Sequence, residues 1–479
     1  MGSLGRRLCV RPEAAAMGLC ADHRPAAQRE AATDGSRSEG GRKSRPYRSR
    51  IMKVLFLDTF GDALDLALRA QKVGHDVVYF VDSANERYQF IGKGLTKLVR
   101  NFRPWLRWAD LVVLCDNTKF LREIDVYRRE NPQAVVFGPT QAVAEWEQDR
   151  SIGQEVLIEH DIPIISFQEF KDYDAAIAYV KRRDTRLVSK PFGDADKSLS
   201  YCAKSPEDLV FMLKKWKKER KLKGSFIIQD FIEGVEFGVG VYVGPSGFIS
   251  PWESNWEFKK LMPNDVGQST GETGTVLAYT DKSKLAEQML QPFENTLISL
   301  GYSGCVDINC IIDKQGRPWP LEWTMRLGFP ATQLQTRLMP NDPIEWIARG
   351  VITGEKAKFK TDTVCVGVAV CLPPYPYPSA PLNLVLDFPI YGMNGKNANA
   401  LHAYQVQKGD DTPWKSAGDY LLVVTGVAPT VSGAAKKAYV TIKELIIPGS
   451  PLYRCDIGAK LQKCLPEIQK HGYALEFTY

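Results

Sequence analysis

The chain has 479 residues, of which 44% are apolar and 25% charged, a composition typical of a soluble globular protein with roughly two to four domains. It contains no run of about 18 apolar residues and no apolar stretch near its start, so we expect neither a membrane span nor a secretory signal. The ten cysteines form no C-x-x-C pair and the five histidines are dispersed, which argues against a zinc site. A cytoplasmic protein is expected.

The net charge of +6 comes entirely from the first part of the chain. Residues 1–50 carry eleven Arg and Lys and five Asp and Glu, so the remaining residues are neutral overall and indicate no nucleic-acid partner. The same segment is rich in Arg, Ala, Gly and Ser and has no periodicity. We predict a disordered basic extension over 1–51, either without function or with a targeting or nucleic-acid role.

From Met52 onward, apolar strands alternate with amphipathic helices. The segment 52–58 has the unbroken apolar character of a buried parallel strand. Further strands are predicted at 76–80, 109–114 and 135–139, and helices at about 62–72 and 120–130. This alternation predicts a Rossmann-like α/β domain over 52–150, built on a small open parallel sheet.

The rest of the chain mixes helices with strands in a less regular order. Helices are predicted at 141–160, 174–182 and 282–300, and strands at 162–165, 185–190, 305–312 and 318–323, with a further pair of strands near 226–230 and 237–243. A Pro-rich segment at 372–378 precedes mixed strands and helices. The predicted fold class is therefore α/β and α+β, in several domains.

Two lysines suggest a phosphate-binding turn. Lys190 ends an apolar strand, and the polar turn that follows contains Lys197. Two ammonium groups beside a flexible turn are suited to clamp nucleotide phosphates. The alternative is that both are ordinary surface lysines.

A strand that runs into a Gly-x-Glu turn follows at 227–236. Its order of amide, aromatic, aliphatic and acidic residues resembles the adenine hinge of ATP-grasp enzymes. The resemblance implies that Gln229 faces the adenine amino group, that the Ile232 backbone bonds the ring edge, and that Phe231 belongs to the ATP site. It also implies that Glu236 holds the ribose hydroxyls, which a carboxylate does well. The alternative is an acidic turn between strands.

A candidate metal site lies on two neighbouring strands. Oxygen atoms from Asn309 or Asp307 and from Glu322 are expected to converge on a hard cation, and Mg²⁺ bound there would bridge two phosphates. The alternative is a set of solvated carboxylates at strand ends.

Beyond these features, residues 52–479 resemble phosphoribosylamine–glycine ligases of purine biosynthesis. The motifs at 137–140 and 160–163 are similar to the entry into the ATP-grasp module of that family, which places Arg150 at its nucleotide-binding lysine. The segment 264–274 is similar to its substrate loop, which implies substrate-binding roles for Asp265, Gly267, Thr270 and Gly271. Segments that match its metal strands and its C-terminal domain lie at 312–316, 322–328, 421–426 and 454–458.

This resemblance implies a domain layout and a reaction. A pre-ATP-grasp domain would span 52–150, an ATP-grasp module 151–348 with a lid at about 170–245, and a C-terminal domain 349–479. ATP would phosphorylate the carboxylate of glycine or another amino acid, and an amine would attack the acyl phosphate. Lys190, Lys197, Arg150 and Mg²⁺ would neutralise the phosphate charge, while Arg326 would orient the carboxylate. We expect a monomer or homodimer without a membrane partner.

The chain departs from the family where the amine would bind. The glycine-rich turn of the family, which ends in Arg-Glu-His and cradles the phosphoribosyl group, corresponds here to 59–64 with Asp62 in place of the arginine. Thr324 stands for the metal asparagine of the family, and 329–331 reads Phe-Pro-Ala instead of Asp-Pro-Glu. Three functions follow as alternatives: the ligase of the family, a divergent ligase that uses another amine, and a non-catalytic ATP-binding protein.

Overall fold

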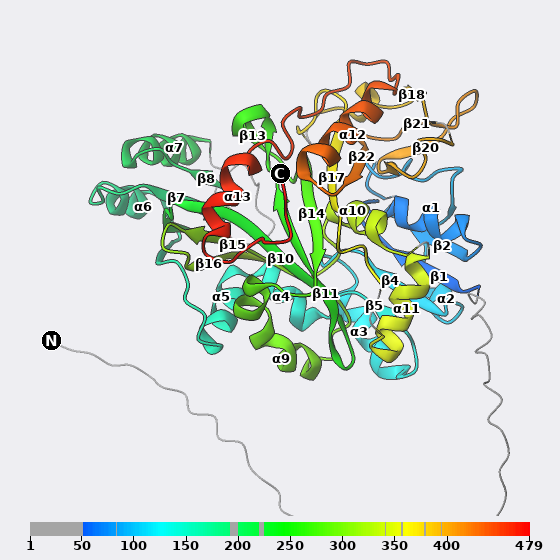
Figure 1. Cartoon of the computed structure of the whole chain (residues 1–479), viewed down its shortest axis with the longest axis horizontal. Coiled ribbons are helices and arrows are strands. Elements are labelled where there is room, and N and C mark those ends of the chain that lie inside the picture. Colours follow the sequence, from blue (N-terminus) through cyan, green and yellow to red (C-terminus); the bar gives the residue numbers. More distant parts are fainter. Residues whose placement is uncertain are drawn as a thin grey trace, which may run out of the picture. The chain divides into compact units, whose positions relative to one another are not determined.

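A computed structural model (Figure 1) describes residues 51–82, 84–191, 200–219, 225–340, 342–355, 358–377, 380–393 and 395–479. Contacts between Cα atoms group residues 49–479 into one unit. Lys197 and all but the last residue of the expected 1–51 extension lie outside the described residues. Within the described residues, no helix has the length and apolar character needed to cross a membrane.

The first five strands form an open parallel sheet, as the sequence predicts. The strand order is β3-β2-β1-β4-β5, and every neighbouring pair is parallel. The bounds are β1 Lys53–Leu57, β2 Asp76–Phe80, β3 Lys97–Val99, β4 Leu111–Leu114 and β5 Val136–Phe137, with helices α1 Leu64–Lys72, α2 Arg103–Leu106 and α3 Leu121–Glu130. The strand order reverses between β1 and β4, so a ligand crevice is expected at the carboxyl ends of these two strands.

A four-stranded sheet with its own apolar core follows. Its order is β6-β9-β7-β8, and it packs on two helices through residues such as Phe170, Leu213 and Trp216. The bounds are β6 Phe167–Phe170, β7 Leu187–Pro191, β8 Tyr201–Cys202, β9 Phe226–Asp230, α6 Tyr173–Val180 and α7 Pro206–Lys218. These elements lie almost entirely within the segment predicted to be the lid.

Two predicted features of this region are wrong. The strands near 226–230 and 237–243 do not pair: β9 pairs with β6 and β7, because its buried side chains face the small core, whereas β10 belongs to another sheet. The segment 162–165 is not a strand, since β6 begins only at Phe167. Pro163 has no backbone N–H to donate to a neighbouring strand.

The third sheet has eight strands in the order β16-β15-β10-β11-β14-β17-β22-β19, and every neighbouring pair is antiparallel. Its strands are β10 Gly234–Gly244, β11 Gly247–Glu257, β14 Gly274–Thr280, β15 Gly304–Asp313, β16 Pro318–Thr324, β17 Val364–Cys371, β19 Leu401–Ala403 and β22 Tyr420–Ala428. β17, β19 and β22 come from the last 130 residues, so that part of the chain completes the same sheet.

Helices and short strands surround this sheet (Figure 1). The helices are α4 Gln141–Gln148, α5 Arg150–Glu159, α8 Lys284–Met289, α9 Glu294–Ser299, α10 Ala331–Leu338, α11 Pro343–Thr353, α12 Val431–Lys443 and α13 Leu461–Gln469. The short elements are β12 Lys260–Met262, β13 Val266–Ser269, β18 Pro389–Ile390, β20 Val406–Lys408, β21 Trp414–Ser416 and the 3-10 turns η2 Pro263–Asp265, η3 Gln291–Phe293 and η4 Leu382–Leu384.

Two helices predicted to be continuous are each divided. The helix at 141–160 ends at Gln148, and Asp149 caps a new helix by accepting a hydrogen bond from Ser151 N. The helix at 282–300 is divided by η3, where Pro292 has no N–H to donate. The first division places Arg150 at a helix start, next to the site.

Candidate functional site

Two rows of polar side chains cross one face of the large sheet. In register, Asn309, Gly238 and Asn255 form one row on β15, β10 and β11. Directly opposed residues on neighbouring strands project from the same face of a sheet. A Cβ placed on Gly238 would lie 2.3 Å from Asn255 Oδ1 and 2.6 Å from Asn309 Oδ1. Glycine therefore leaves a gap between two amide oxygens.

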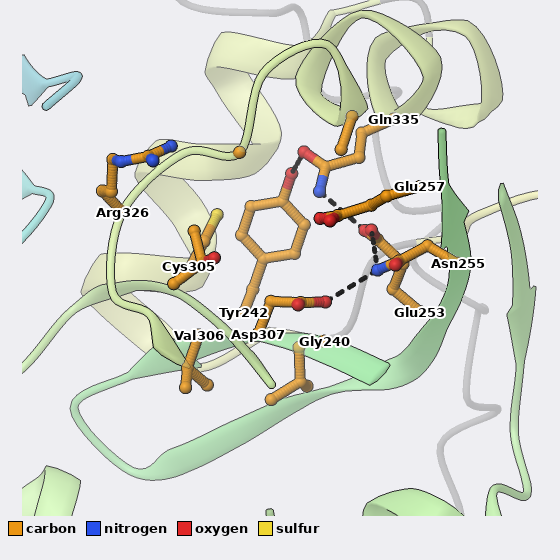
Figure 2. A pocket seen from close by; sticks show the side chains of 14 residues that line it. Gly240, Tyr242, Glu253, Asn255, Glu257, Cys305, Val306, Asp307, Arg326 and Gln335 are labelled. Carbon is orange, nitrogen blue, oxygen red and sulfur yellow. Dashed lines mark hydrogen bonds between the residues drawn. The ribbon is translucent and has the colours of Figure 1, made fainter. Parts of the chain in front are cut away.

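The second row continues the pattern with acids. It contains Asp307, Gly240 and Glu253, again with the glycine on β10. Above it lies a pocket, to which Thr324 and Arg326 also contribute. Figure 2 shows the side chains of the second row converging there. Four strands, β10, β11, β15 and β16, therefore line this pocket.

Hydrogen bonds order the pocket wall (Figure 2). Asn255 Nδ2 donates to Asp307 Oδ2 at 2.7 Å, and Gln335 Nε2 donates to Glu253 Oε2 at 2.6 Å. The Tyr242 hydroxyl donates to Gln335 Oε1 at 2.8 Å. Burial raises the pKa of Glu253 to about 7. Burial, together with Glu253, also raises the pKa of Asp307 well above its usual range. The pocket is therefore acidic and is suited to a cation or a hydrogen-bond donor.

Lys259 stands at the centre of the adjoining charged cluster. Its Nζ lies 2.9 Å from Glu236, 2.9 Å from Glu257 and 2.8 Å from Glu322. Its positive charge holds the pKa of Glu322 well below the usual range. Lys259 was not singled out from the sequence. Its three partners lie on three different strands, so the only signal in the sequence was its position just before the segment 264–274.

Lys190 and Arg150 complete a cationic wall. Burial, then the nearby Arg150, lowers the pKa of Lys190 to about 8. Arg150 donates to Leu321 O at 3.1 Å, and its pKa is lowered by burial. Both interact electrostatically with Glu322. Three cations that face carboxylates in this way are suited to a polyphosphate accompanied by a divalent cation.

The predicted hinge joins the four-stranded sheet to the large one. Gln229 is buried on β9 opposite Val188 of β7. The Arg186 guanidinium lies 3.7 Å from the centre of the Phe231 ring, and Ile232 is half-buried in the following loop. Glu236 is the hinge residue that reaches the Lys259 cluster. The adenine contacts of Gln229, Phe231 and Ile232 remain predictions.

The predicted metal ligands offer only oxygen atoms. Asn309 lies opposite Glu322 in the register of β15 and β16, and Asp307 lies opposite Thr324. Asn255 Oδ1 is buried and has no hydrogen-bond partner among the described residues. Those residues contain no group of three His, Cys, Asp or Glu arranged to hold a metal ion. The donor set nevertheless fits a hard cation that keeps its own waters, as Mg²⁺ does.

The predicted substrate loop is tied to the C-terminal part of the chain. Asp265 pairs with the buried Arg454 at 2.8 Å. The Thr270 hydroxyl donates to Lys259 O at 2.9 Å, so the loop also rests on the charged cluster. Gly267 has φ +85°, and a Cβ on Gly271 would meet nothing within 4 Å. None of these four predicted residues lines the pocket; Arg454, which anchors them, was not singled out from the sequence.

Arg326 connects the pocket with the parallel sheet. It lines the pocket, and its guanidinium pairs with Glu147 at 3.1 Å and donates to Leu327 O at 2.8 Å. It also interacts electrostatically with Asp62 and Asp116, which follow β1 and β4. Arg326 is therefore positioned between the pocket and the crevice of the parallel sheet.

Comparisons with known proteins agree with this arrangement. The sequence model described as "Phosphoribosylglycinamide synthetase, ATP-grasp (A) domain" matches residues 148–332. The phosphoribosylamine–glycine ligase of Leptospira interrogans serovar Lai is 26% identical over 339 residues, which cover 67% of this chain and 77% of the relative. The enzyme of the same name from Escherichia coli O157:H7 is 24% identical over 335 residues, with 67% and 76% covered.

Solved structures share the fold. Phosphoribosylamine–glycine ligase from Thermotoga maritima matches with a TM-score of 0.66 and 21% identity, over 85% of this chain and 100% of that chain. An L-amino acid ligase from Bacillus licheniformis matches with a TM-score of 0.55 and 13% identity, over 84% and 100%. Residues 148–332 therefore match the ATP-grasp domain of phosphoribosylglycinamide synthetase, and the chain is similar to phosphoribosylamine–glycine ligases in sequence and in fold.

Proposed function

We propose that this protein phosphorylates the carboxylate of a small amino acid with ATP and joins the acyl phosphate to an amine. The matched ATP-grasp domain and the similarity to phosphoribosylamine–glycine ligases support an ATP-dependent ligase that forms amide bonds. The relatives are named for glycine, so glycine is the first carboxylate to test.

One observation carries the proposal: a cationic wall adjoins an acidic pocket on one sheet. Lys190, Arg150 and Lys259 surround Glu322, and all three interact electrostatically with it. The pocket holds Asp307 and Arg326. This arrangement supports a site for phosphates next to a site for a zwitterionic amino acid, whose carboxylate needs a cation and whose ammonium needs an acid.

The roles of the residues follow from this arrangement. A carboxylate oxygen attacks the γ-phosphorus, an O–P bond forms, and the bond to ADP breaks; Lys190, Arg150 and Lys259 stabilise the charge on the transferred group. Arg326, held by Glu147 at 3.1 Å, orients the carboxylate. The amine then attacks the acyl carbon, phosphate leaves, and the amine loses a proton. Mg²⁺, held by Asp307, Asn309 and Glu322, would supply charge neutralisation at the phosphates.

Hydroxylamine provides a test that does not depend on the natural amine, because it converts an acyl phosphate into a hydroxamate. With Mg-ATP and glycine or other amino acids, we expect ADP and hydroxamate to appear together and only when the amino acid is present. Release of ADP without any amino acid, or no hydroxamate with any of them, would contradict the proposal. Lys190→Met should abolish both products, whereas Lys282→Met, at an exposed lysine, serves as the matched control.

A further inference from the structure

A second ligand position, here called the crevice, is expected at the carboxyl ends of β1 and β4, where the order of the parallel strands reverses. Helix α1 begins there at Leu64. Successive backbone N–H groups at a helix N-terminus form a concavity that favours phosphate and other anions. A phosphorylated substrate would be held at this position.

The chain fills this position with a carboxylate of its own. Gly61 N and Asp62 N donate to Asp58 Oδ1 at 2.8 and 3.1 Å, and Ala63 N donates to Asp58 Oδ2 at 2.6 Å. Asp58 is 1% exposed, and the Tyr79 hydroxyl donates to the same carboxylate. The three N–H groups of the loop that leads into α1 are therefore already satisfied.

The charges around the crevice are also unfavourable to an anion. Asp116 accepts a hydrogen bond from Thr59 N at 2.9 Å. Burial, then the neighbouring Asp58, raises the pKa of Asp62 to about 7. The cation that acts on Asp62 is Arg326, whose guanidinium is already bound to Glu147 at 3.1 Å. A phosphate here would meet three carboxylates and one arginine that is already paired.

The crevice adjoins the pocket in which the acyl group would form. Arg326 lines that pocket and interacts electrostatically with Asp62. Gln333 of α10 donates through Nε2 to Asp62 O at 3.0 Å. Its own Oε1 is buried without a hydrogen-bond partner among the described residues, on a side chain that is 1% exposed. An unsatisfied acceptor beside Asp62 favours a ligand that donates hydrogen bonds.

We infer that the Asp58 carboxylate occupies the place of a phosphate and so closes this crevice to phosphorylated substrates. The amine substrate therefore carries no phosphate. It presents a neutral or cationic group that donates hydrogen bonds to Asp62. The inference rests on the proposed function. It separates this chain from relatives that are named for phosphoribosylamine.

The test uses ribose 5-phosphate, a stable probe that carries both a sugar and a phosphate, with the full-length chain. We expect about 5 mM probe to leave the rate of hydroxamate formation unchanged, and calorimetric titration to detect no binding tighter than about 1 mM. Competition with hydroxylamine, tighter binding, or turnover with phosphoribosylamine would overturn the inference. If no hydroxamate forms with any amino acid, the proposed function fails, but the titration still decides the inference.

Asp58→Gly supplies the complementary test, because it frees three N–H groups. We expect this variant to gain inhibition by ribose 5-phosphate, with at least about a tenfold fall in the inhibition constant. The matched control is Asp110→Gly, at a residue that accepts from Lys53 N at 2.9 Å at the opposite end of the same strands. If the Asp58→Gly protein folds but is still not inhibited by ribose 5-phosphate, the role inferred for Asp58 is wrong. If the variant does not fold, the titration of the unmodified chain decides.

Discussion

The charged cluster around Glu322 and the crevice of the parallel sheet differ in the charges that surround a ligand. On the nucleotide side, Lys190, Arg150 and Lys259 surround Glu322. On the other side, Asp58 and Asp116 accept hydrogen bonds from the backbone of the loop that follows β1. In the first region three cationic side chains are available to a phosphate. In the second, carboxylates of the chain itself already accept the hydrogen bonds of the loop N–H groups. We therefore propose that the cluster around Glu322 takes an anionic ligand and that the crevice of the parallel sheet is closed to one.

This comparison explains how the chain resembles its relatives in one half and differs in the other. Phosphate binding at the proposed nucleotide site depends on side chains from three parts of the chain, with Lys190 on β7, Arg150 at the start of α5 and Lys259 after β11. In the crevice it depends on free backbone N–H groups, and one carboxylate is enough to occupy them. We therefore infer that Asp58, directly after β1, excludes a phosphorylated amine from the crevice.

After the loss of activity expected for Lys190→Met, the largest effect is expected for Lys259→Met. The change leaves Glu236, Glu257 and Glu322 facing one another without the ammonium that pairs with all three. We expect hydroxamate formation to fall by about 100-fold or more. The assay of ADP release checks this, and Lys282→Met should retain the full rate. If Lys259→Met were fully active, the charged cluster would not be the phosphate site.

The pH dependence of ATP use should reveal Lys190. Because its pKa is lowered to about 8, it loses its charge as the pH rises through that value. We expect kcat/KM for ATP to fall above about pH 8, by up to about tenfold per pH unit. The stability of the fold should change in the opposite direction. Between about pH 8 and 10.5 the Lys190 side chain is protonated in the unfolded state but not in the folded state, so the free energy of unfolding rises with pH across that window.

Lys190→Arg is the control for this assignment. Arginine keeps its charge throughout the range, so the fall in kcat/KM above pH 8 should disappear even if the maximal rate is lower. An unchanged pH profile in Lys190→Arg would assign the titration to another group.

Gly238→Ala tests the gap in the sheet. The new methyl group would lie within 2.6 Å of the Asn255 and Asn309 oxygens, both of which would have to shift. We expect the Mg²⁺ concentration that gives half-maximal activity to rise about tenfold. The free energy of unfolding should fall by about 1–3 kcal/mol. Gly395→Ala is the matched control, since a Cβ there meets nothing within 4 Å. A magnesium titration and thermal unfolding measure the two effects.

The smallest effect is expected for Asp62→Asn on the other side of the site. This substitution removes the carboxylate of residue 62 but leaves the Asp58 carboxylate bound to the loop N–H groups. We expect a change of about threefold in KM for the amine and none in KM for ATP. A change in KM for ATP instead would show that the two regions are not independent.

Part of this picture could be predicted from the sequence. Four strands of the parallel sheet were predicted because each is a short apolar run, as in 53–57 and 76–80, whereas the three-residue β3 was not predicted. Asp307, Asn309 and Glu322 were placed on paired strands because two apolar segments flank the turn at Gly316. The pairing of β9 was predicted wrongly, because an apolar strand does not reveal which of two cores will bury it.

The sequence by itself determined which side chains are available and where strands and helices form, since these depend on local apolar patterns and on residues such as Pro292. Only the tertiary structure decided that Lys259 meets three carboxylates, that Asn255 and Asn309 face each other across Gly238, and that Asp58 occupies the N–H groups of its own loop. These contacts arise from strand register and from the path of a turn, and both are set by packing over long distances in the chain.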